Sequence, residues 1–311
     1  MTEHLDLHRA NPDELAQAFR NVHDVWPSAP DPEEHTRRRL ADPRYKNATS
    51  YVGTLDGRVV TACNCFHVSV SIDGTVERAC AIGAVHTPAE FRGRGFAPRL
   101  LAFAESQERA VGKTFSLLYS DNGPAYYERL GYRPCPAKQG WADLSSAPRD
   151  LPEPCILRRI DALEVIPELS EIYDRAHAGL ALSIARSSDY WRYLITQRPE
   201  DEFYFAELVG KRVGYLRVVN RPHGLLLRDL AIVDETEQVE RGLYSAVIGL
   251  AVARGAGRVG GWMPADTVSR ELFSVTDRVK ELTMLKPLVE RIHIEDRHRA
   301  AAEHFHEIDH V

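Results

Sequence analysis

A strand-like segment, a glycine–arginine loop and a helix-like segment follow one another at residues 85–112, and this order constrains the fold most strongly. The loop reads RGRG at residues 92–95, and the segment after it has apolar residues at helical spacing up to Gly112. Such a loop leaves backbone N–H groups free at a helix N-terminus, where the helix dipole favours negative charge. Glycines permit close backbone approach, and arginines add positive charge. The pattern predicts a site for a phosphate-like anion; the alternative is a surface turn with solvated arginines.

The pattern around this loop predicts an α+β fold. Two helix-like segments come first, and three β-rich runs follow, separated by Asp-Gly pairs at 56–57 and 73–74 that are typical of hairpin turns. A short apolar run at 114–120 comes after the central helix. The second half repeats the order of helices, hairpin strands, helix and strand. We expect two domains, 1–150 and 155–311, each a mixed, mostly antiparallel sheet flanked by helices, joined by a proline-rich linker.

Charge and composition exclude several classes of protein. The formal net charge of −6 argues against general binding to nucleic acid or to an anionic membrane. No run of about 18 apolar residues predicts a membrane span. The polar N-terminus lacks the apolar core of a signal peptide, so we expect a cytoplasmic protein.

The cysteines and histidines do not form a familiar metal motif. The five cysteines are odd in number and scattered, which indicates reduced thiols. A His-x-His pair at 304–306 and His310 near the C-terminus invite a metal hypothesis, but no cysteine or carboxylate set completes it. We expect packing or surface histidines and no metal.

The loop and a second motif together resemble the GNAT (GCN5-related N-acetyltransferase) superfamily. Its R/Q-x-x-G-x-G/A signature is matched by Arg92, Gly95 and Ala97. About 30 residues downstream, AYYERLGYRP resembles the family's FYEKLGF segment, with matches at Tyr127 and Gly131. The resemblance covers the first half of the chain and implies acetyl-CoA bound between the fourth and fifth strands of that half.

The resemblance also implies where the cofactor lies. The pyrophosphate is expected on the loop, and the pantetheine arm along the end of the preceding strand. An Asn near the end of the fifth strand and a tyrosine that packs on pantetheine complete the set. The expected cofactor-binding residues are Val85, His86, Thr87, Arg92, Gly93, Arg94, Gly95, Phe96, Ala97, Asn122 and Tyr126.

Acyl transfer to an amine needs a proton donor for the thiolate and a base for the amine. The resemblance implies Tyr127 as the general acid, although Tyr126 and Tyr127 could exchange roles. For the base, Glu77, Glu90 and His86 are candidates, and none is singled out.

The C-terminus supplies another candidate base. Tandem-domain acetyltransferases of the "enhanced intracellular survival" type, which this chain resembles, use their C-terminal carboxylate as the base. The chain ends in HFHEIDHV, so we expect the Val311 carboxylate, or Asp309 beside it, to reach the first domain's active site. The alternative is an ordinary C-terminal strand.

The second half has an acidic segment, VDETEQVE, where the first half has its basic loop. Because acidic side chains repel pyrophosphate, we expect a degenerate GNAT domain that binds no CoA and walls off the substrate pocket. Tyr190, Trp191 and Trp262 could line that pocket or belong to the core.

The sequence as a whole predicts an acyl-CoA-dependent N-acyltransferase, most simply an N-acetyltransferase, that acts on a primary amine of a small molecule. The alternatives are a GNAT-fold transferase with another acyl donor (a longer acyl-CoA or an aminoacyl-tRNA) and a non-catalytic acyl-CoA-binding sensor. A homo-oligomer is possible, but the sequence does not fix the oligomeric state.

Overall fold

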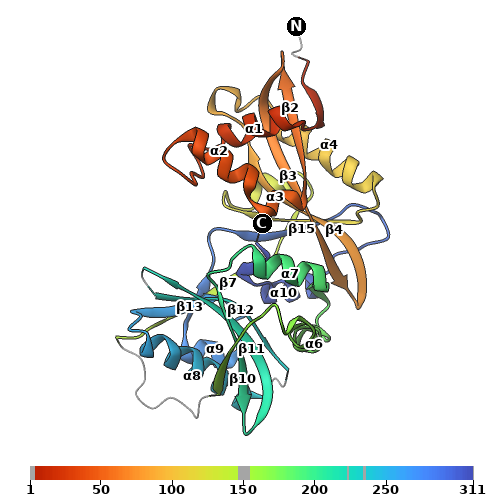
Figure 1. Cartoon of the computed structure of the whole chain (residues 1–311). Helices are drawn as coiled ribbons and strands as arrows, with labels where there is room; N and C mark the ends of the chain where they lie inside the picture. Colours follow the sequence, from red (N-terminus) through yellow and green to blue (C-terminus); the bar gives the residue numbers. More distant parts are fainter. Residues whose placement is uncertain (1–3, 146–154, 223, 234–235, 311) are drawn as a thin grey trace.

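The computed structural model describes residues 4–145, 155–222, 224–233 and 236–310. Within these residues, the strands form one eight-stranded and one seven-stranded sheet, each mixed and flanked by helices (Figure 1). The predicted α+β class is confirmed.

A meander of three long strands forms the centre of the first sheet. It consists of β2 (Ala48–Leu55), β3 (Arg58–Ile72) and β4 (Thr75–His86), paired antiparallel. Both Asp-Gly turns are confirmed, because all four of their residues have positive φ, as a type I′ hairpin turn requires. Helix α4 (Phe96–Ala110) follows the loop and leads to β5 (Phe115–Ser120), which lies parallel to β4.

The N-terminal elements complete this half. Asn11 and Glu14 form a capping box at the start of the first helix, as the Asn-Pro pair predicts. The elements are β1 (Asp6–Arg9), α1 (Pro12–Asn21), α2 (Pro32–Ala41) and α3 (Pro43–Lys46).

The second sheet repeats the order of the first. Three antiparallel strands precede α8 (Glu237–Ala253), and β13 (Arg258–Trp262) then lies parallel to β12, as β5 does to β4. The preceding elements are β8 (Ile156–Ile160), α6 (Ile166–His177), α7 (Ser188–Thr196), β10 (Glu202–Leu208), β11 (Lys211–Arg221) and β12 (Gly224–Ile232).

Each sheet also contains strands from the other half of the chain. β7 (Lys138–Asp143) pairs with β13 in the second sheet. In return, β9 (Leu182–Ala185) pairs with β3, and β15 (Leu282–Pro287) pairs with β5, in the first sheet. The halves are therefore interwoven, while the division into domains 1–150 and 155–311 stays a prediction. The remaining elements are β6 (Arg133–Pro134), α9 (Thr267–Leu272), β14 (Ser274–Asp277) and α10 (Asp296–Ala301).

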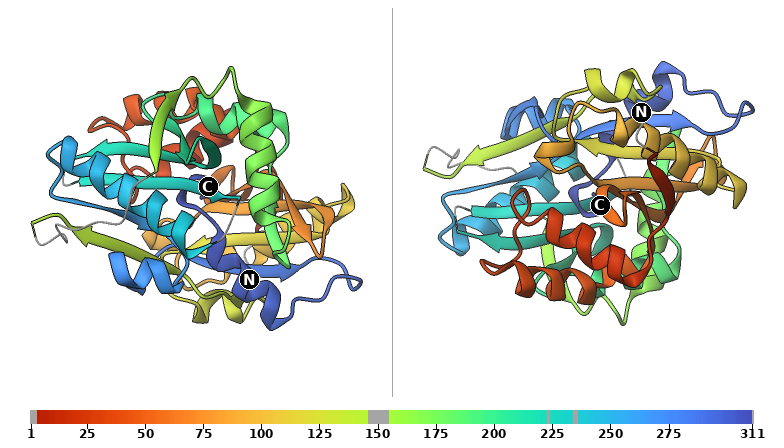
Figure 2. Two further views of the ribbon diagram at one scale, coloured as in Figure 1. Left: turned by 90° about the horizontal axis from the view of Figure 1, so that it is seen from below. Right: turned by 90° about the horizontal axis from the view of Figure 1, so that it is seen from above.

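The C-terminal segment lies in the middle of the molecule. Its last described residues lie between the two sheets in Figure 1 and near the middle of the molecule in both views of Figure 2. Helix α4 covers one face of the first sheet, where Leu100, Leu101 and Ala104 pack on Cys65 and Cys80. The other face carries a separate core that includes C-terminal residues such as Phe305. The five cysteines are free and buried, as expected of reduced thiols.

Candidate functional site

β4 and β5 separate at one end of the first sheet. They pair from Ala79 with Phe115 to Ile82 with Leu118, and β4 then continues to His86 without further pairing to β5. A β-bulge causes this, since the β3–β4 register shifts near Gly83 and Ala84 has a φ of 49°. A bulge bends its strand and changes the direction of the residues after it. The result is an opening between the two strands, directly before the glycine–arginine loop.

The loop leaves open space in front of α4. Gly95 is the N-cap of α4 with a φ of 73°, and no side chain caps the helix. Gly93 has a φ of 78°, and a Cβ added at either glycine would meet no atom within 4 Å. In contrast, Asn11, Asp31 and Thr236 cap α1, α2 and α8. The start of α4 thus offers uncapped backbone N–H groups, the geometry that binds phosphate groups.

The arginines of the loop have different surroundings. The Arg92 Nε donates a hydrogen bond of 2.9 Å to the Thr87 carbonyl oxygen, so this side chain ties the loop to the end of β4. Arg94 is exposed, and its guanidinium lies 5.5 Å from the centre of the Phe91 ring. Both arginines are exposed, so their side chains can approach an anion on the loop.

The strand end before the loop is partly buried. His86 is buried, and its pKa is lowered by burial and by the charge of Arg92, so the imidazole is neutral at pH 7. The Thr61 hydroxyl donates to the His86 carbonyl oxygen (3.2 Å), and the Thr87 hydroxyl donates to Thr61 (3.0 Å). These contacts fix the backbone at the opening. The roles assigned to Val85, His86 and Thr87 stay predictions.

Tyr127 lies on α5 (Ala125–Glu128), just after the end of β5. Its side chain is buried against the rings of Tyr126 and Tyr132, with centroids 4.9 and 5.9 Å away. Burial raises the pKa of Tyr127, so the phenol keeps its proton at neutral pH, as a proton donor must. Asn122 is exposed, and its backbone N–H donates to the Ser120 hydroxyl (3.3 Å).

The described chain ends beside this opening. The His310 ring packs on Tyr119 of β5 and on Trp262 of β13, with centroids 5.0 and 5.9 Å away. Tyr119 comes one residue after Leu118, the last β5 residue paired with β4. The structure therefore brings the end of the C-terminal segment to the end of β5. Val311, the predicted base, lies outside the described residues.

A buried ion network anchors this segment. Arg186 donates hydrogen bonds of 2.6 Å both to Asp229 of β12 and to Asp309. All three side chains are almost fully buried. Asp309, the alternative base, is thus bound to Arg186, although burial raises its pKa. The sequence analysis missed Arg186 and Asp229. These residues and Asp309 lie far apart in the chain, and no local sequence pattern predicts that they form ion pairs.

The two glutamates that are candidate bases have ion partners of their own. Glu77 accepts hydrogen bonds of 2.5 and 2.7 Å from Arg291, near the hairpin end of β4. Glu90 is exposed and pairs with Arg58 at 2.6 Å. Because each carboxylate is paired with an arginine, neither is placed as a general base that is free to take a proton from the amine.

The aromatic residues assigned to the second half divide between core and interface. Trp191 is fully buried in the core of the second half, which favours the packing alternative. The Tyr190 hydroxyl lies 3.5 Å from Asp309, and the Trp262 ring lies 5.9 Å, between centroids, from the His310 ring. Tyr190 and Trp262 therefore flank the C-terminal segment.

The equivalent opening in the second half is built differently. β12 and β13 pair only from Leu225 with Val259 to Leu227 with Gly261. However, the Thr236 hydroxyl caps α8, and acidic Glu237 and Glu240 stand in its first turn. His306 of the C-terminal segment contacts the Leu230 backbone there. These features disfavour an anion, while the absence of a CoA site in this half stays a prediction.

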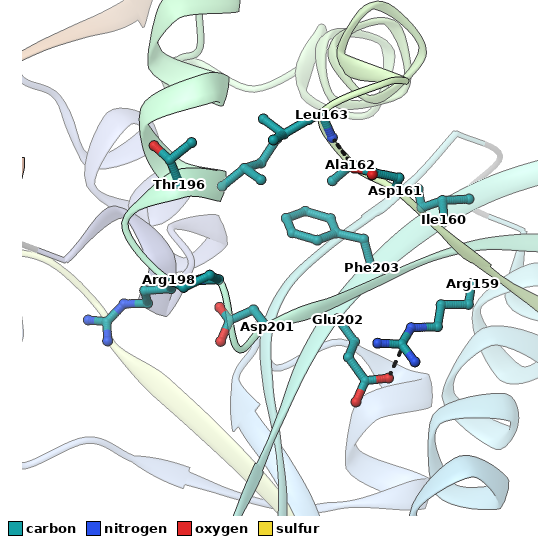
Figure 3. Close-up of a pocket in the computed structure, with 12 residues that line it drawn as sticks. Arg159, Ile160, Asp161, Ala162, Leu163, Thr196, Arg198, Asp201, Glu202 and Phe203 are labelled. Atoms are coloured by element: carbon teal, nitrogen blue, oxygen red, sulfur yellow. Dashed lines mark hydrogen bonds and ion pairs between the residues drawn. The ribbon is translucent and has the colours of Figure 1, made fainter.

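The second half also holds an open pocket of about 690 Å³ (Figure 3). Two of its carboxylates have ion partners, since Arg217 binds Asp201 at 2.6 Å and Arg254 binds Glu202 at 2.7 Å. The third, Asp161, accepts a hydrogen bond of 3.0 Å from the Leu163 backbone N–H. Figure 3 shows Arg198 pointing away from Phe203, which lies at the centre of the pocket. No predicted site residue lines this pocket, so it is not the candidate site.

The described residues hold neither a metal cluster nor a membrane-spanning helix. They contain no group of three or more His, Cys, Asp or Glu side chains placed to hold a metal ion. Among the same residues, no helix combines the length and the apolar character needed to cross a membrane.

Comparisons with known proteins agree with this geometry. Residues 6–135 match the family described as "Acetyltransferase (GNAT) domain". A search of curated proteins finds no match.

Several solved structures share the fold over nearly the whole chain. A probable N-acyltransferase of unknown function from Enterococcus faecalis is 15% identical, with a TM-score of 0.70, and the match covers 92% of this chain and 72% of that one. Eis1 from Mycobacterium abscessus is 16% identical, with a TM-score of 0.62 and coverage of 92% and 74%. A tandem GNAT protein from the clavulanic acid biosynthesis pathway is 18% identical, with a TM-score of 0.56 and coverage of 93% and 100%.

Proposed function

We propose that this chain, a tandem-domain member of the GNAT superfamily, is an acyl-CoA-dependent N-acyltransferase that uses acetyl-CoA and acylates a primary amine of a small molecule. The observation that carries the proposal is the uncapped start of α4, with Gly93 and Gly95 in front of it, directly after the opening between β4 and β5. The pyrophosphate would bind the N–H groups of the loop from Arg92 to Ala97, and the acyl-pantetheine arm would enter the opening.

The reaction requires direct attack of the amine nitrogen on the thioester carbonyl carbon. The C–N bond forms, the C–S bond breaks, and the thiolate takes a proton from a donor. Tyr127 suits this role because its phenol is protonated and adjoins the end of β5. Backbone N–H groups beside the opening are suited to stabilise the oxyanion.

The amine must lose a proton, and we assign this role to the carboxylate of Val311. The support is the place of His310, whose ring contacts Tyr119 at the end of β5. The Arg186–Asp309 ion pair would hold the segment there.

The direct test is thiol release from acetyl-CoA in the presence of a panel of small primary amines. We expect turnover with at least one amine, and loss of turnover when three glycines are added after Val311, because the carboxylate is displaced. The same three residues added before Met1 are the control and should leave turnover unchanged.

Two outcomes would contradict parts of this proposal. Full activity of the C-terminally extended protein would remove Val311 as the base. Tight acetyl-CoA binding without turnover on any amine would favour the sensor alternative over the enzyme.

A further inference from the structure

Tyr127, the proposed general acid, stands on a single helical turn. α5 has four residues, Ala125–Glu128, and no side chain caps its N-terminus. One turn has little stability of its own, because forming the first turn fixes several residues for few hydrogen bonds. The position of Tyr127 must therefore be set by contacts with the chain outside α5.

Tyr132 makes two of these contacts. Its backbone N–H donates a hydrogen bond of 3.1 Å to the Tyr127 carbonyl oxygen, across a turn in which Gly131 has a φ of 88°. Its ring meets the Tyr127 ring edge-on, with centroids 5.9 Å apart and 76° between the planes, an arrangement that aromatic pairs prefer. The other ring on Tyr127, that of Tyr126, belongs to α5 itself. Tyr132 thus links both the backbone and the ring of Tyr127 to the chain outside the helix.

A buried hydrogen-bond network holds Tyr132 in turn. The Tyr132 side chain is almost fully buried, and its hydroxyl donates a hydrogen bond of 2.9 Å to Glu105 of α4. Because a phenol has one proton, the hydroxyl of Ser116 on β5, which lies 2.7 Å away, is the donor to Tyr132. Burial and the charge of Glu105 raise the pKa of Tyr132, so the phenol keeps this proton. The Tyr132 ring is therefore fixed to both α4 and β5.

The second half of the chain completes this network. Lys286 of β15 forms an ion pair with the other carboxylate oxygen of Glu105, and its Nζ lies 5.3 Å from the centre of the Tyr132 ring. The Lys286 side chain also covers the turn, since a Cβ added at Gly131 would lie 3.5 Å from the Lys286 Cε. A buried carboxylate is costly without a cation, so Lys286 stabilises the ionised Glu105 that accepts from Tyr132.

The hydroxyl of Tyr127 itself stays outside the network. In the described part of the chain it has no hydrogen-bond partner, and it is not among the side-chain atoms that are both unpartnered and closed to solvent. By contrast, the hydroxyls of Tyr51 and Tyr132 are bound to Glu108 and Glu105. The contacts therefore fix the Tyr127 ring and leave its hydroxyl free for a ligand.

From these contacts, we propose that Tyr132, Glu105 and Lys286 are positioning residues, which hold the Tyr127 hydroxyl where it can protonate the leaving thiolate. This inference rests on the proposed acyltransferase function, with Tyr127 as the acid. Through Lys286, it gives the second half a part in the chemistry of the first. Because a displacement of about 1 Å can cost about 10²-fold in rate, a loosened Tyr132 slows proton transfer and leaves acetyl-CoA binding intact.

The first test compares two buried tyrosines of the full-length chain. Tyr132→Phe removes the hydroxyl and keeps the ring. Tyr51→Phe is the matched control, because the Tyr51 hydroxyl makes the same bond of 2.9 Å to Glu108, also on α4, while the ring contact of Tyr51 is with Phe103. Urea unfolding, kcat and KM for acetyl-CoA are measured for each. We expect both variants to lose stability, and Tyr132→Phe alone to lower kcat, by about tenfold, with KM nearly unchanged.

The second test concerns the contribution of the second half. Lys286→Met removes the cation of Glu105 and should lower kcat several-fold. Lys138→Met is its control, because Lys138 has a similar exposure and forms an ion pair with Asp277. The control should leave kcat unchanged. If Tyr132→Phe does not fold, Lys286→Met tests the network in its place.

A third measurement does not depend on turnover. Fluorotyrosine introduced at position 127 reports the protonation and the mobility of this ring by fluorine NMR. Burial raises the pKa of Tyr127, so Tyr132→Phe should lower the pKa of the label towards that of free fluorotyrosine and broaden its signal. Tyr51→Phe should change neither.

The outcomes separate this inference from the proposed function. The inference is wrong if Tyr132→Phe and Lys286→Met leave both kcat and the fluorine signal of Tyr127 unchanged, or if Tyr51→Phe changes them equally. If the wild-type chain releases no thiol with any amine, the proposed function fails, and the fluorine signal alone decides whether the network positions Tyr127.

Discussion

At the scale of single residues, burial decides which side chains can handle a proton. The pKa of Tyr127 is raised by burial, and that of His86 is lowered by it, so both groups are neutral at pH 7. Tyr127 can therefore give a proton to a thiolate but cannot act as a base. His86 lies beside the loop charge of Arg92, which further disfavours its protonated form.

We predict that Tyr127→Phe lowers kcat by about 10²-fold or more and leaves KM for acetyl-CoA nearly unchanged, because general acid catalysis contributes on this scale. Steady-state thiol release measures both constants. Tyr126→Phe, at the half-buried neighbouring ring, is the matched control and should have a much smaller effect. The reverse order of the two variants would mean that Tyr126 is the acid.

We predict that Arg186→Met destabilises the protein by about 3–5 kcal/mol, because it leaves Asp229 and Asp309 buried without their cation. Arg175→Met, which removes an exposed arginine 3.8 Å from Glu171 on α6, should change stability by less than about 1 kcal/mol. Urea unfolding measures both. Equal effects of the two substitutions would contradict the anchoring role of Arg186.

At the scale of elements, the C-terminal segment holds buried histidines whose pKa values depend on the fold. Burial lowers the pKa of His306 and of His310 to about 4, and burial likewise lowers that of His177, which packs near His306, to about 3. The ordinary value for all three is 6.5. The folded chain therefore keeps these rings neutral at pH values where the unfolded chain protonates them.

We predict that stability is greatest above pH 6.5 and falls as the pH drops from 6.5 towards 4. The unfolded state then binds protons that the folded state does not, with a slope that approaches about 1.4 kcal/mol per pH unit for each histidine. Urea unfolding at pH 7.5, 6.5 and 5.5 measures the slope. His306→Gln should reduce the slope, and the exposed His293→Gln should not; a stability independent of pH in this range would refute the prediction.

Local elements follow from the sequence, and long-range pairings do not. The Asp-Gly turns, the capped first helix and α4 depend on neighbouring residues, so their patterns predict them correctly. The bulge at Ala84 leaves no such mark, because alanine has no preference for positive φ. The pairing of β15 with β5 joins segments more than 160 residues apart, and no local pattern encodes it.

The same limit applies to the candidate site. The loop and Tyr127 stand in consecutive motifs and are found from them, with the family resemblance that they carry. The ion network of Arg186, Asp229 and Asp309 depends on packing between distant segments, so only the structure brings these residues together.

At the scale of the whole molecule, strand exchange makes the halves depend on each other. Without the second half, β5 loses β15, and part of β3 loses β9. Without the first half, β13 loses β7. Unpaired edges expose backbone groups and favour aggregation.

We predict that the full chain unfolds in one cooperative transition and that residues 1–150 alone do not form a stable fold. Differential scanning calorimetry of both proteins tests this. Two separate transitions in the full chain, or a stable isolated first half that binds acetyl-CoA, would show that the interwoven strands are dispensable.

The central claim is that the loop before α4 binds the pyrophosphate of an acyl-CoA, and calorimetric titration with acetyl-CoA tests it most directly. The comparison is between wild type, Arg94→Glu and Gly95→Asp, with Arg99→Glu one turn into α4 as the control. We predict that wild type binds one acetyl-CoA per chain and that both loop substitutions weaken binding by about tenfold or more, because each places negative charge where the phosphates would lie. The control should bind closer to wild type. Absence of binding to the wild-type chain, or binding that both loop substitutions leave intact, would contradict the account.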